Sequence, residues 1–125
     1  MSETCPAEKL RKRVSTYERI FPWDGDVPDY EPPAEQSIAA RASREGRDPE
    51  ELVYDVLLER EGTRILYRPL SNYAYGNLDT VGEMLRHPNT LVSLGDGGAH
   101  VGVLCDSTSM AYMVTHWTRD RTRGE

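Results

Sequence analysis

The sequence is poor in the residues that define several protein classes. Its 125 residues include only two cysteines, three histidines and one phenylalanine. Cys5 and Cys105 are too few and too far apart for a disulfide framework or a Cys-x-x-Cys metal site, so we expect free thiols in a reducing compartment. No apolar run approaches the ~18 residues of a membrane span, and the first residues carry charges without the apolar stretch of a signal peptide. These absences predict a cytoplasmic protein with no membrane partner.

The charge balance and the length set two further limits. The formal net charge is −6 at pH 7, so the chain has no overall basic footprint and we expect no nucleic-acid partner. Residues 9–13 and 119–123 are locally basic, and we interpret both as solvated helix faces. A chain of this length can bury the core of one domain, but a closed (β/α)₈ barrel needs about 250 residues.

Residues 90–102, TLVSLGDGGAHVG, form the most informative stretch of the chain. Residues 90–94 are mostly apolar with a β-branched start, which predicts a buried strand. Gly97 and Gly98 then allow a sharp turn, so Asp96 and His100 follow the carboxyl end of a strand. In parallel α/β folds, active sites lie at the carboxyl ends of the strands. The alternative is a plain turn, in which the aspartate serves only local hydrogen bonds.

The other elements are predicted from apolar spacing, caps and breakers. We expect helices over residues 7–20, 34–45 and 48–62, a strand over residues 64–69, and a helix that begins after Asn77 and ends before Pro88. A last helix capped by Ser107 or Thr108 would bury a stripe of Met110, Met113, Val114 and Trp117. The predicted helices at 34–45 and 48–62 form a hairpin around Asp48-Pro49.

Three polar or aromatic groups besides Asp96 are candidates for a site. A strand at 64–69, a helix and a strand at 90–94 would form a crossover between parallel strands, which places the loop with Asn72 and Tyr73 on the same edge as Asp96. In the proline-rich loop over 21–33, Trp23 and Tyr30 either line a pocket or anchor the loop on the surface. His116 and Asp120 lie four residues apart, as a metal-binding pair or as a solvated pair.

Several stretches together resemble a known family. They are YERIFPWDGDVPDYEPP, DPEELVYDVLLEREG, LYRPLSNYAYGNLDTVGEMLRHP, SLGDGGAHVGVLCD and YMVTHWTRDRTRGE. From about Tyr17 onward the chain resembles the C-terminal part of the amidohydrolase superfamily, in its N-acyl-D-amino-acid deacylase (D-aminoacylase-like) branch. The resemblance implies part of a (β/α)₈ TIM barrel, helix-rich with a few parallel strands, and hydrolysis of amide C–N bonds with zinc.

The resemblance also implies roles for single residues. Asp96 matches the aspartate that acts as general base and touches the metal, and His100 matches a histidine that binds a substrate carboxylate in some relatives. We expect Asn72, Tyr73, Gly97 and Gly98 to border an N-acyl amino acid beside His100. A bound metal would lower the pKa of a water molecule to about 7, and Asp96 would then take its proton.

The chain departs from the family in its metal ligands. The resemblance implies a His-x-His pair, but the only histidines are His87, His100 and His116. We therefore expect residues 1–125 to be a single segment of a larger enzyme, with a helix and proline-rich loop over 1–33 and a helical hairpin and terminal β/α units over 34–125. Alone it should be inactive and self-associate. A non-catalytic α/β scaffold or oligomerisation module, and a truncated product without independent function, remain open alternatives.

Overall fold

A computed structural model describes residues 16–23, 25, 27, 29–93 and 108–122. The chain divides into two compact units, Met1–Leu78 and Asp79–Glu125, which we call the N-terminal and C-terminal units. The described residues are mostly helical, with four α-helices and one two-stranded antiparallel sheet. The predicted helix-rich character is therefore confirmed. Each unit is described below by itself.

The N-terminal unit begins with short elements and a well-capped helix. A 3₁₀ turn, η1 (Tyr17–Arg19), lies between extended residues where the end of a helix was predicted, so the described part of that prediction was wrong. A second turn, η2 (Ala34–Gln36), precedes α2 (Ile38–Glu45). The Ser37 hydroxyl caps α2 by accepting a hydrogen bond from the Ala40 amide at 3.2 Å. Gly46 ends the helix with a φ of 63°, a left-handed conformation that favours glycine.

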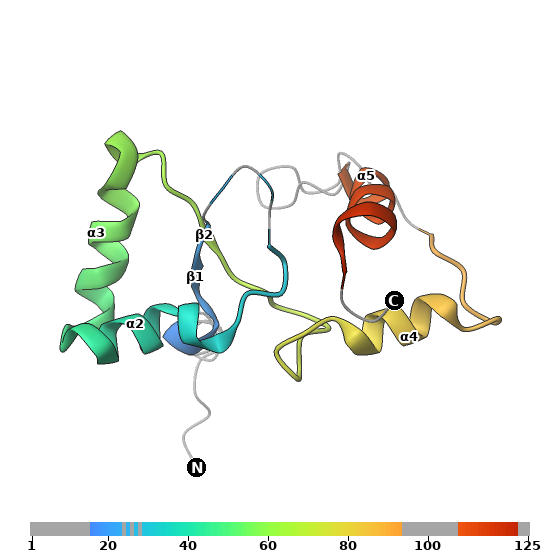
Figure 1. The fold of residues 1–125 in the computed structure, drawn as a ribbon, viewed down its shortest axis with the longest axis horizontal. Coiled ribbons are helices and arrows are strands. Elements are labelled where there is room, and N and C mark those ends of the chain that lie inside the picture. Colours follow the sequence, from blue (N-terminus) through green and yellow to red (C-terminus); the bar gives the residue numbers. More distant parts are fainter. Residues whose placement is uncertain (1–15, 24, 26, 28, 94–107, 123–125) are drawn as a thin grey trace, which may run out of the picture. The chain divides into compact units, whose positions relative to one another are not determined.

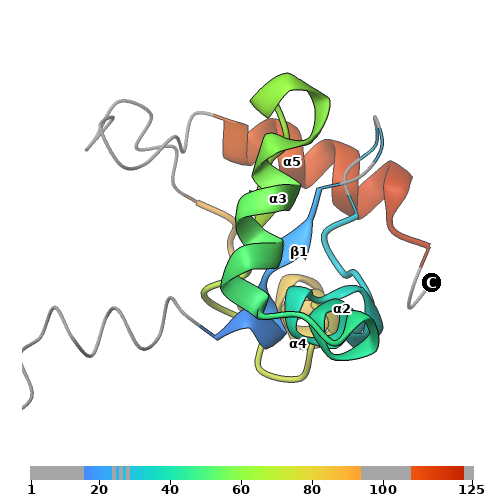
Figure 2. The ribbon, with the colours of Figure 1, turned by 90° about the vertical axis from the view of Figure 1, so that its left-hand side faces the viewer.

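Helix α3 (Pro49–Gly62) follows after a sharp corner, as the proline and its cap predict. The Asp48 carboxylate accepts hydrogen bonds from the amides of Glu50 at 2.8 Å and Glu51 at 3.3 Å. Figures 1 and 2 show α3 meeting α2 at a steep angle. The helix loses its regular geometry before Gly62, because Glu59 is extended and Arg60 and Glu61 have positive φ.

The core of the N-terminal unit lies between α2 and α3. Ile38 and Ala42 of α2 meet Leu52 and Val56 of α3, and all four side chains are buried. Removing a side chain such as leucine or valine from water contributes about 1.5–3 kcal/mol, so this cluster is the main stabilising feature of the unit. Leu57 of α3 lies off the Leu52–Val56 row and is 40% exposed.

The strand predicted over 64–69 forms, but its partner differs from the expected one. β2 (Leu66–Tyr67) pairs antiparallel with β1 (Phe21–Pro22), in the register Phe21↔Tyr67 and Pro22↔Leu66. Residues 90–93, the described part of the predicted second strand, lie in no strand. The described residues therefore contain no parallel pair and no barrel. Among the described residues, no strand pairs with residues 90–93 to complete their backbone hydrogen bonds.

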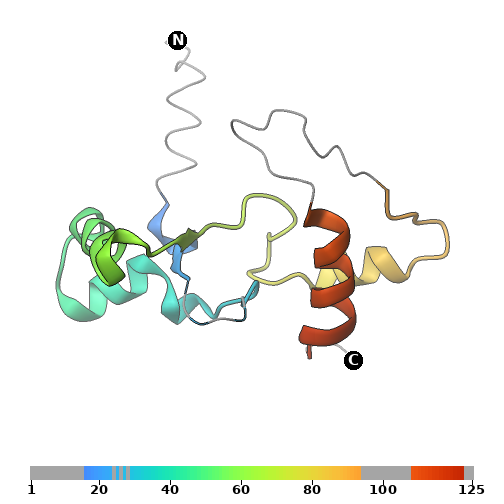
Figure 3. The same ribbon diagram turned by 90° about the horizontal axis from the view of Figure 1, so that it is seen from above.

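The C-terminal unit joins three helical segments by aromatic and ionic contacts. α4 (Asp79–Arg86) and α5 (Ser109–Thr115) lie near each other in Figures 1 and 3, and α5 continues as a π-helical turn, η4 (His116–Asp120). Gly82 of α4 faces the Trp117 ring so closely that an added Cβ would lie 3.2 Å from it. Arg121 pairs with Asp79 at 2.5 Å and lies 5.0 Å from the centroid of the Trp117 ring.

The predicted core stripe on the last helix was wrong in part. Met110 is 54% exposed and Val114 is 65% exposed, whereas Met113 and Trp117 are half-buried. The buried side chain on this segment is His116, which stacks on Tyr112 at 4.9 Å with an angle of 10° between the rings. The segment thus buries an imidazole in place of the apolar side chains that helical spacing indicated.

The described helices give no candidate for a membrane span, since none of them combines the required length with an apolar sequence.

Candidate functional site

The centre of the predicted site lies outside the described residues. This applies to Asp96, Gly97, Gly98 and His100 together. The described chain stops at Ser93 and resumes at Thr108, so the structure tests neither the catalytic nor the turn interpretation of this stretch. On the approach to it, Leu91 is 91% exposed and Val92 is 48% exposed.

The loop with Asn72 and Tyr73 is described, and its two candidate residues differ. Asn72 is exposed with a φ of 57°, whereas the Tyr73 side chain is buried at 3% exposure. The next aromatic residue, Tyr75, is 79% exposed. A ligand that reached this loop from solvent would therefore meet Asn72 and Tyr75 first, and Tyr73 would act from beneath the surface.

This loop is tied to the proline-rich segment of the same unit. The Leu78 amide donates a hydrogen bond to the Glu31 carboxylate at 2.8 Å, and Arg19 donates to the Ala74 carbonyl at 3.5 Å. Gly76 has a φ of 72°, and its amide donates to the Tyr73 carbonyl. These contacts fix both ends of the loop to separate parts of the N-terminal unit.

The two aromatic residues of the proline-rich loop meet a third ring on β2. The ring centroids of Trp23 and Tyr30 are 5.6 Å apart, those of Trp23 and Tyr67 are 5.6 Å apart, and those of Tyr30 and Tyr67 are 6.0 Å apart. All three pairs are edge-to-face, a favoured geometry for aromatic rings. The Tyr67 hydroxyl donates to the Tyr30 carbonyl at 3.2 Å. The prediction that these rings anchor the loop is confirmed.

The cluster of Trp23, Tyr30 and Tyr67, which we call the aromatic triad, also borders a cavity. It encloses about 40 Å³, and Trp23 and Tyr67 contribute to its lining together with Phe21 and Asp29. Tyr30 is not among the lining residues of this cavity, and the pocket interpretation of Trp23 and Tyr30 stays a prediction. Tyr67 was missed as a member of this group, because no local pattern links a strand residue to a loop so distant in sequence.

The described residues do not fit a metal site. No group of three histidine, cysteine or acidic side chains in the described part of the chain is placed to hold an ion. His87 Nδ1 accepts a hydrogen bond from the Asn89 amide at 3.2 Å, and His116 packs between Tyr112 and Trp117. The His116–Asp120 pair is not the solvated pair we expected, since His116 is 5% exposed and Asp120 binds Arg119.

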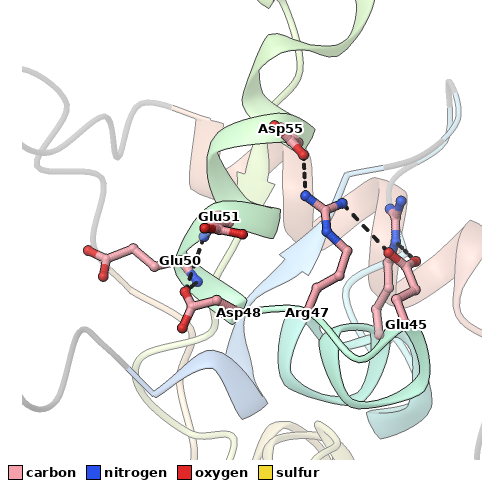
Figure 4. A network of polar contacts seen from close by, with 7 residues as sticks. Glu45, Arg47, Asp48, Glu50, Glu51 and Asp55 are labelled. Atoms are coloured by element: carbon pink, nitrogen blue, oxygen red, sulfur yellow. Dashed lines mark hydrogen bonds and ion pairs between the residues drawn. The ribbon is translucent and has the colours of Figure 1, made fainter.

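A charged network surrounds the corner between α2 and α3, as Figure 4 shows. Arg47 lies between Glu45 and Asp55 and forms ion pairs with both. The hydrogen bond that Arg47 donates to the Asp55 carboxylate is the main cause that raises the pKa of Arg47 above its ordinary value. The hydrogen bond from Arg41 is the main cause that lowers the pKa of Glu45. Arg41 and Arg47 thus pair with Glu45 and Asp55, while the Asp48 carboxylate accepts hydrogen bonds from backbone amides.

Comparisons of this chain with protein families, with curated proteins and with solved structures find no match. A functional assignment therefore depends on the residues and their arrangement.

Proposed function

We propose that this chain is a segment of a metal-dependent amidohydrolase, in which Asp96 and His100 act on the amide C–N bond of an N-acyl amino acid. One observation carries the proposal: Asp96-Gly97-Gly98-Ala99-His100 follows a strand, a polar and aromatic loop, a helix and an apolar run. The described β2, the loop at 71–78 and α4 occur in that order. This is the order that the resemblance to part of a (β/α)₈ barrel requires.

In this proposal each residue has one task. In a complete enzyme that supplies the metal, Asp96 would accept the proton of the attacking water and return it to the leaving amine. His100 holds the carboxylate of the N-acyl amino acid, while Gly97 and Gly98 let the backbone approach the substrate. Asn72 and Tyr73 border the acyl group. An aspartate with an ordinary pKa near 4 is a poor base for water, and the described residues do not fit a zinc site, so we derive no metal-dependent step for this chain.

The exposed apolar side chains support the view that further protein covers this segment. Twelve large apolar side chains are exposed among the described residues, some of them nearly fully. Where such side chains form a contiguous patch, they mark contacts with other protein or a tendency to associate. We therefore propose that the isolated chain self-associates and that the missing metal ligands belong to other parts of the enzyme. We also propose a cytoplasmic location, from the scarcity of cysteine.

The first test uses the isolated 125-residue chain. It should bind no zinc with high affinity and should not hydrolyse N-acyl-D- or N-acyl-L-amino acids, with or without added zinc. Zinc-dependent turnover that disappears in Asp96→Ala would show instead that the site is complete in this chain or completed by oligomerisation. Sedimentation should show association, and a stable monomer with cooperative unfolding would contradict the segment proposal.

The second test uses a complete enzyme that contains this segment. Asp96→Asn should leave the fold intact and lower kcat by about 10²–10⁴-fold, because the amide cannot accept the proton of the water. His100→Ala should raise KM for N-acyl amino acids and spare acyl amides that lack the carboxylate. If the stretch is only a turn, both changes will alter the melting temperature with little effect on kcat, and the catalytic assignment is wrong.

A non-catalytic scaffold is the second candidate, and one observation favours it. The N-terminal unit has its own buried core, formed by Ile38, Ala42, Leu52 and Val56. A unit with a closed core can serve as a structural module without any chemistry. The hydrolysis assay on a complete protein separates the two candidates, because a scaffold predicts that Asp96→Asn leaves the rate unchanged.

A further inference from the structure

The cavity beside the aromatic triad has the composition of a site for a small organic cation. Its lining includes Trp23, Tyr67 and Phe21, and Asp29 is the charged residue among the described residues that line it. Aromatic rings attract cations through the negative potential of their faces, and a carboxylate adds a charge of the required sign. We propose that this cavity binds a methylated ammonium head group. The proposal is independent of the hydrolase proposed above.

Two of the aromatic residues that line the cavity have rings inclined to each other. The planes of Trp23 and Tyr67 form an angle of 70°. Two inclined rings can thus contact a rounded cation from two sides, as in the aromatic cages that hold methylated ammonium groups.

The rings are held in place before any ligand arrives. The Trp23 amide donates to the Ile65 carbonyl at 2.9 Å, and the Trp23 carbonyl accepts from Arg64 at 3.1 Å. The Tyr67 hydroxyl is bound to the Tyr30 carbonyl, and Tyr67 pairs with Phe21 across the sheet. Binding then orders few side chains, which keeps the entropic cost of association low.

Size and charge narrow the ligand class. One water molecule needs about 10–15 Å³ of such space, so the cavity of about 40 Å³ is suited to a compact group and not to a drug-sized molecule. The nearby guanidinium of Arg64 is paired with Glu59 at 3.1 Å, which reduces its repulsion of a second cation. Asp29 accepts a hydrogen bond from the Glu31 amide at 2.8 Å, and this contact orients its carboxylate.

The test compares a cation with its uncharged isostere. Choline and 3,3-dimethylbutan-1-ol have nearly the same shape, and only choline carries a charge. We expect choline to shift the indole N–H signal of Trp23 saturably at millimolar concentrations, with Trp117→Phe used to assign the two indole signals. The neutral alcohol should bind at least about two- to fivefold more weakly, the ratio that an exposed cation–π contact provides. Equal binding of the two compounds would overturn the proposal.

Variants locate the site and identify the source of the head group. Asp29→Asn should weaken choline binding severalfold, whereas Glu50→Gln, the same loss of charge on the exposed start of α3, should not. Tyr67→Phe keeps the ring and loses only the hydroxyl, so it should bind almost normally if the fold is kept. If a peptide with trimethyllysine binds more tightly than choline, the head group belongs to a protein partner. If choline binds more tightly than the peptide, the head group belongs to a free metabolite. No saturable shift with either compound would mean that the cavity is only a packing void.

Discussion

The two units of the chain are stabilised by different kinds of contact. Every apolar side chain that is buried among the described residues belongs to the N-terminal unit. In the described part of the C-terminal unit, the buried residues are Gly82 and His116, and the contacts are a stacked imidazole, an indole against a glycine and an ion pair. The free energy of apolar burial is non-directional, so it changes little when side chains move slightly. The energies of stacked rings and ion pairs depend on the distance and angle between the groups.

This difference matters for function because the proposed catalytic stretch belongs to the C-terminal unit. Asp96 and His100 lie in a unit whose described part has little aliphatic core of its own. Such a unit gains stability from contacts with neighbouring protein, which agrees with the proposal that a larger enzyme completes it. The N-terminal unit has a buried apolar core of its own and can be ordered without such neighbouring protein. Four predictions test this difference between the two units.

The largest effect is expected in the core of the N-terminal unit. Leu52→Ala should lower the free energy of unfolding of this unit by about 2–5 kcal/mol, because Leu52 is fully buried and truncation leaves a cavity. Leu58→Ala is the matched control on the same helix; Leu58 is 56% exposed, so the loss should stay within about 0.5 kcal/mol. Urea unfolding measures both, and similar losses would contradict the assigned core.

Hydrogen exchange extends this comparison to the other unit. In Leu52→Ala, the amides of α2 and α3 should lose protection, while those of α4 and α5 should keep theirs, since opening follows cooperative units. A parallel loss in both units would show that they unfold together and that the division at Leu78 has no energetic meaning.

The second effect is expected in the C-terminal unit. Gly82→Leu should displace the Trp117 ring, and the overpacking should cost about 1–3 kcal/mol, partly offset by the gain of up to about 1 kcal/mol in helix propensity. Glu83→Leu introduces the same side chain at an exposed neighbour and should leave the ring in place. The indole N–H signal of Trp117 reports the displacement, and an unchanged signal in Gly82→Leu would refute the contact.

The third effect compares the helix caps of the two units. The Asp48 carboxylate binds two amides at the start of α3, whereas the side chain of Thr108 makes no capping hydrogen bond to α5. Asp48→Ala should therefore cost about 1 kcal/mol, and Thr108→Ala a few tenths at most. Thermal unfolding of the two variants checks the difference. An equal loss would mean that Thr108 caps α5 through its side chain after all.

The sequence predicted local structure well where a chemical signal marks it. Ser37, Gly46 and Asp48-Pro49 each fix a helix end through a nearby hydrogen bond or an allowed φ, and the α2–α3 hairpin follows from them. The start of α2 was placed too early, because residues 34–36 form a 3₁₀ turn before the cap. Helical spacing on α5 indicated a buried stripe, but it could not show that His116 would be the buried side chain.

Local sequence patterns could not predict which residues pair when they lie far apart in the sequence. Of the strand predicted over 64–69, only Leu66–Tyr67 forms. A strand of two residues carries no signal for its partner, and the observed partner is the antiparallel Phe21–Pro22. The same limit applies to the candidate site. Asn72 and Tyr73 are adjacent in one loop and looked equivalent, whereas the fold exposes the first and buries the second.

The smallest effect concerns exposed carboxylates, one in each unit. Arg41 binds Glu45 at 2.7 Å, one helical turn apart, and Arg119 binds Asp120 at 2.5 Å. These hydrogen bonds are the main cause that lowers the pKa of each carboxyl below its ordinary value. A lowered folded-state pKa means that the stabilisation is present above the unfolded-state pKa and is lost as the pH falls through the folded-state pKa.

NMR titration of the carboxyl carbons should show this directly. In Arg41→Gln the pKa of Glu45 should rise toward its ordinary value, whereas in Arg44→Gln it should change less, because Arg44 makes the smallest contribution to the shift. High salt should raise the pKa of Glu45 and of Asp120 alike, since both pairs face solvent and are screened. If the pKa of Glu45 keeps its lowered value in Arg41→Gln, the i, i+4 pair on α2 does not persist in solution.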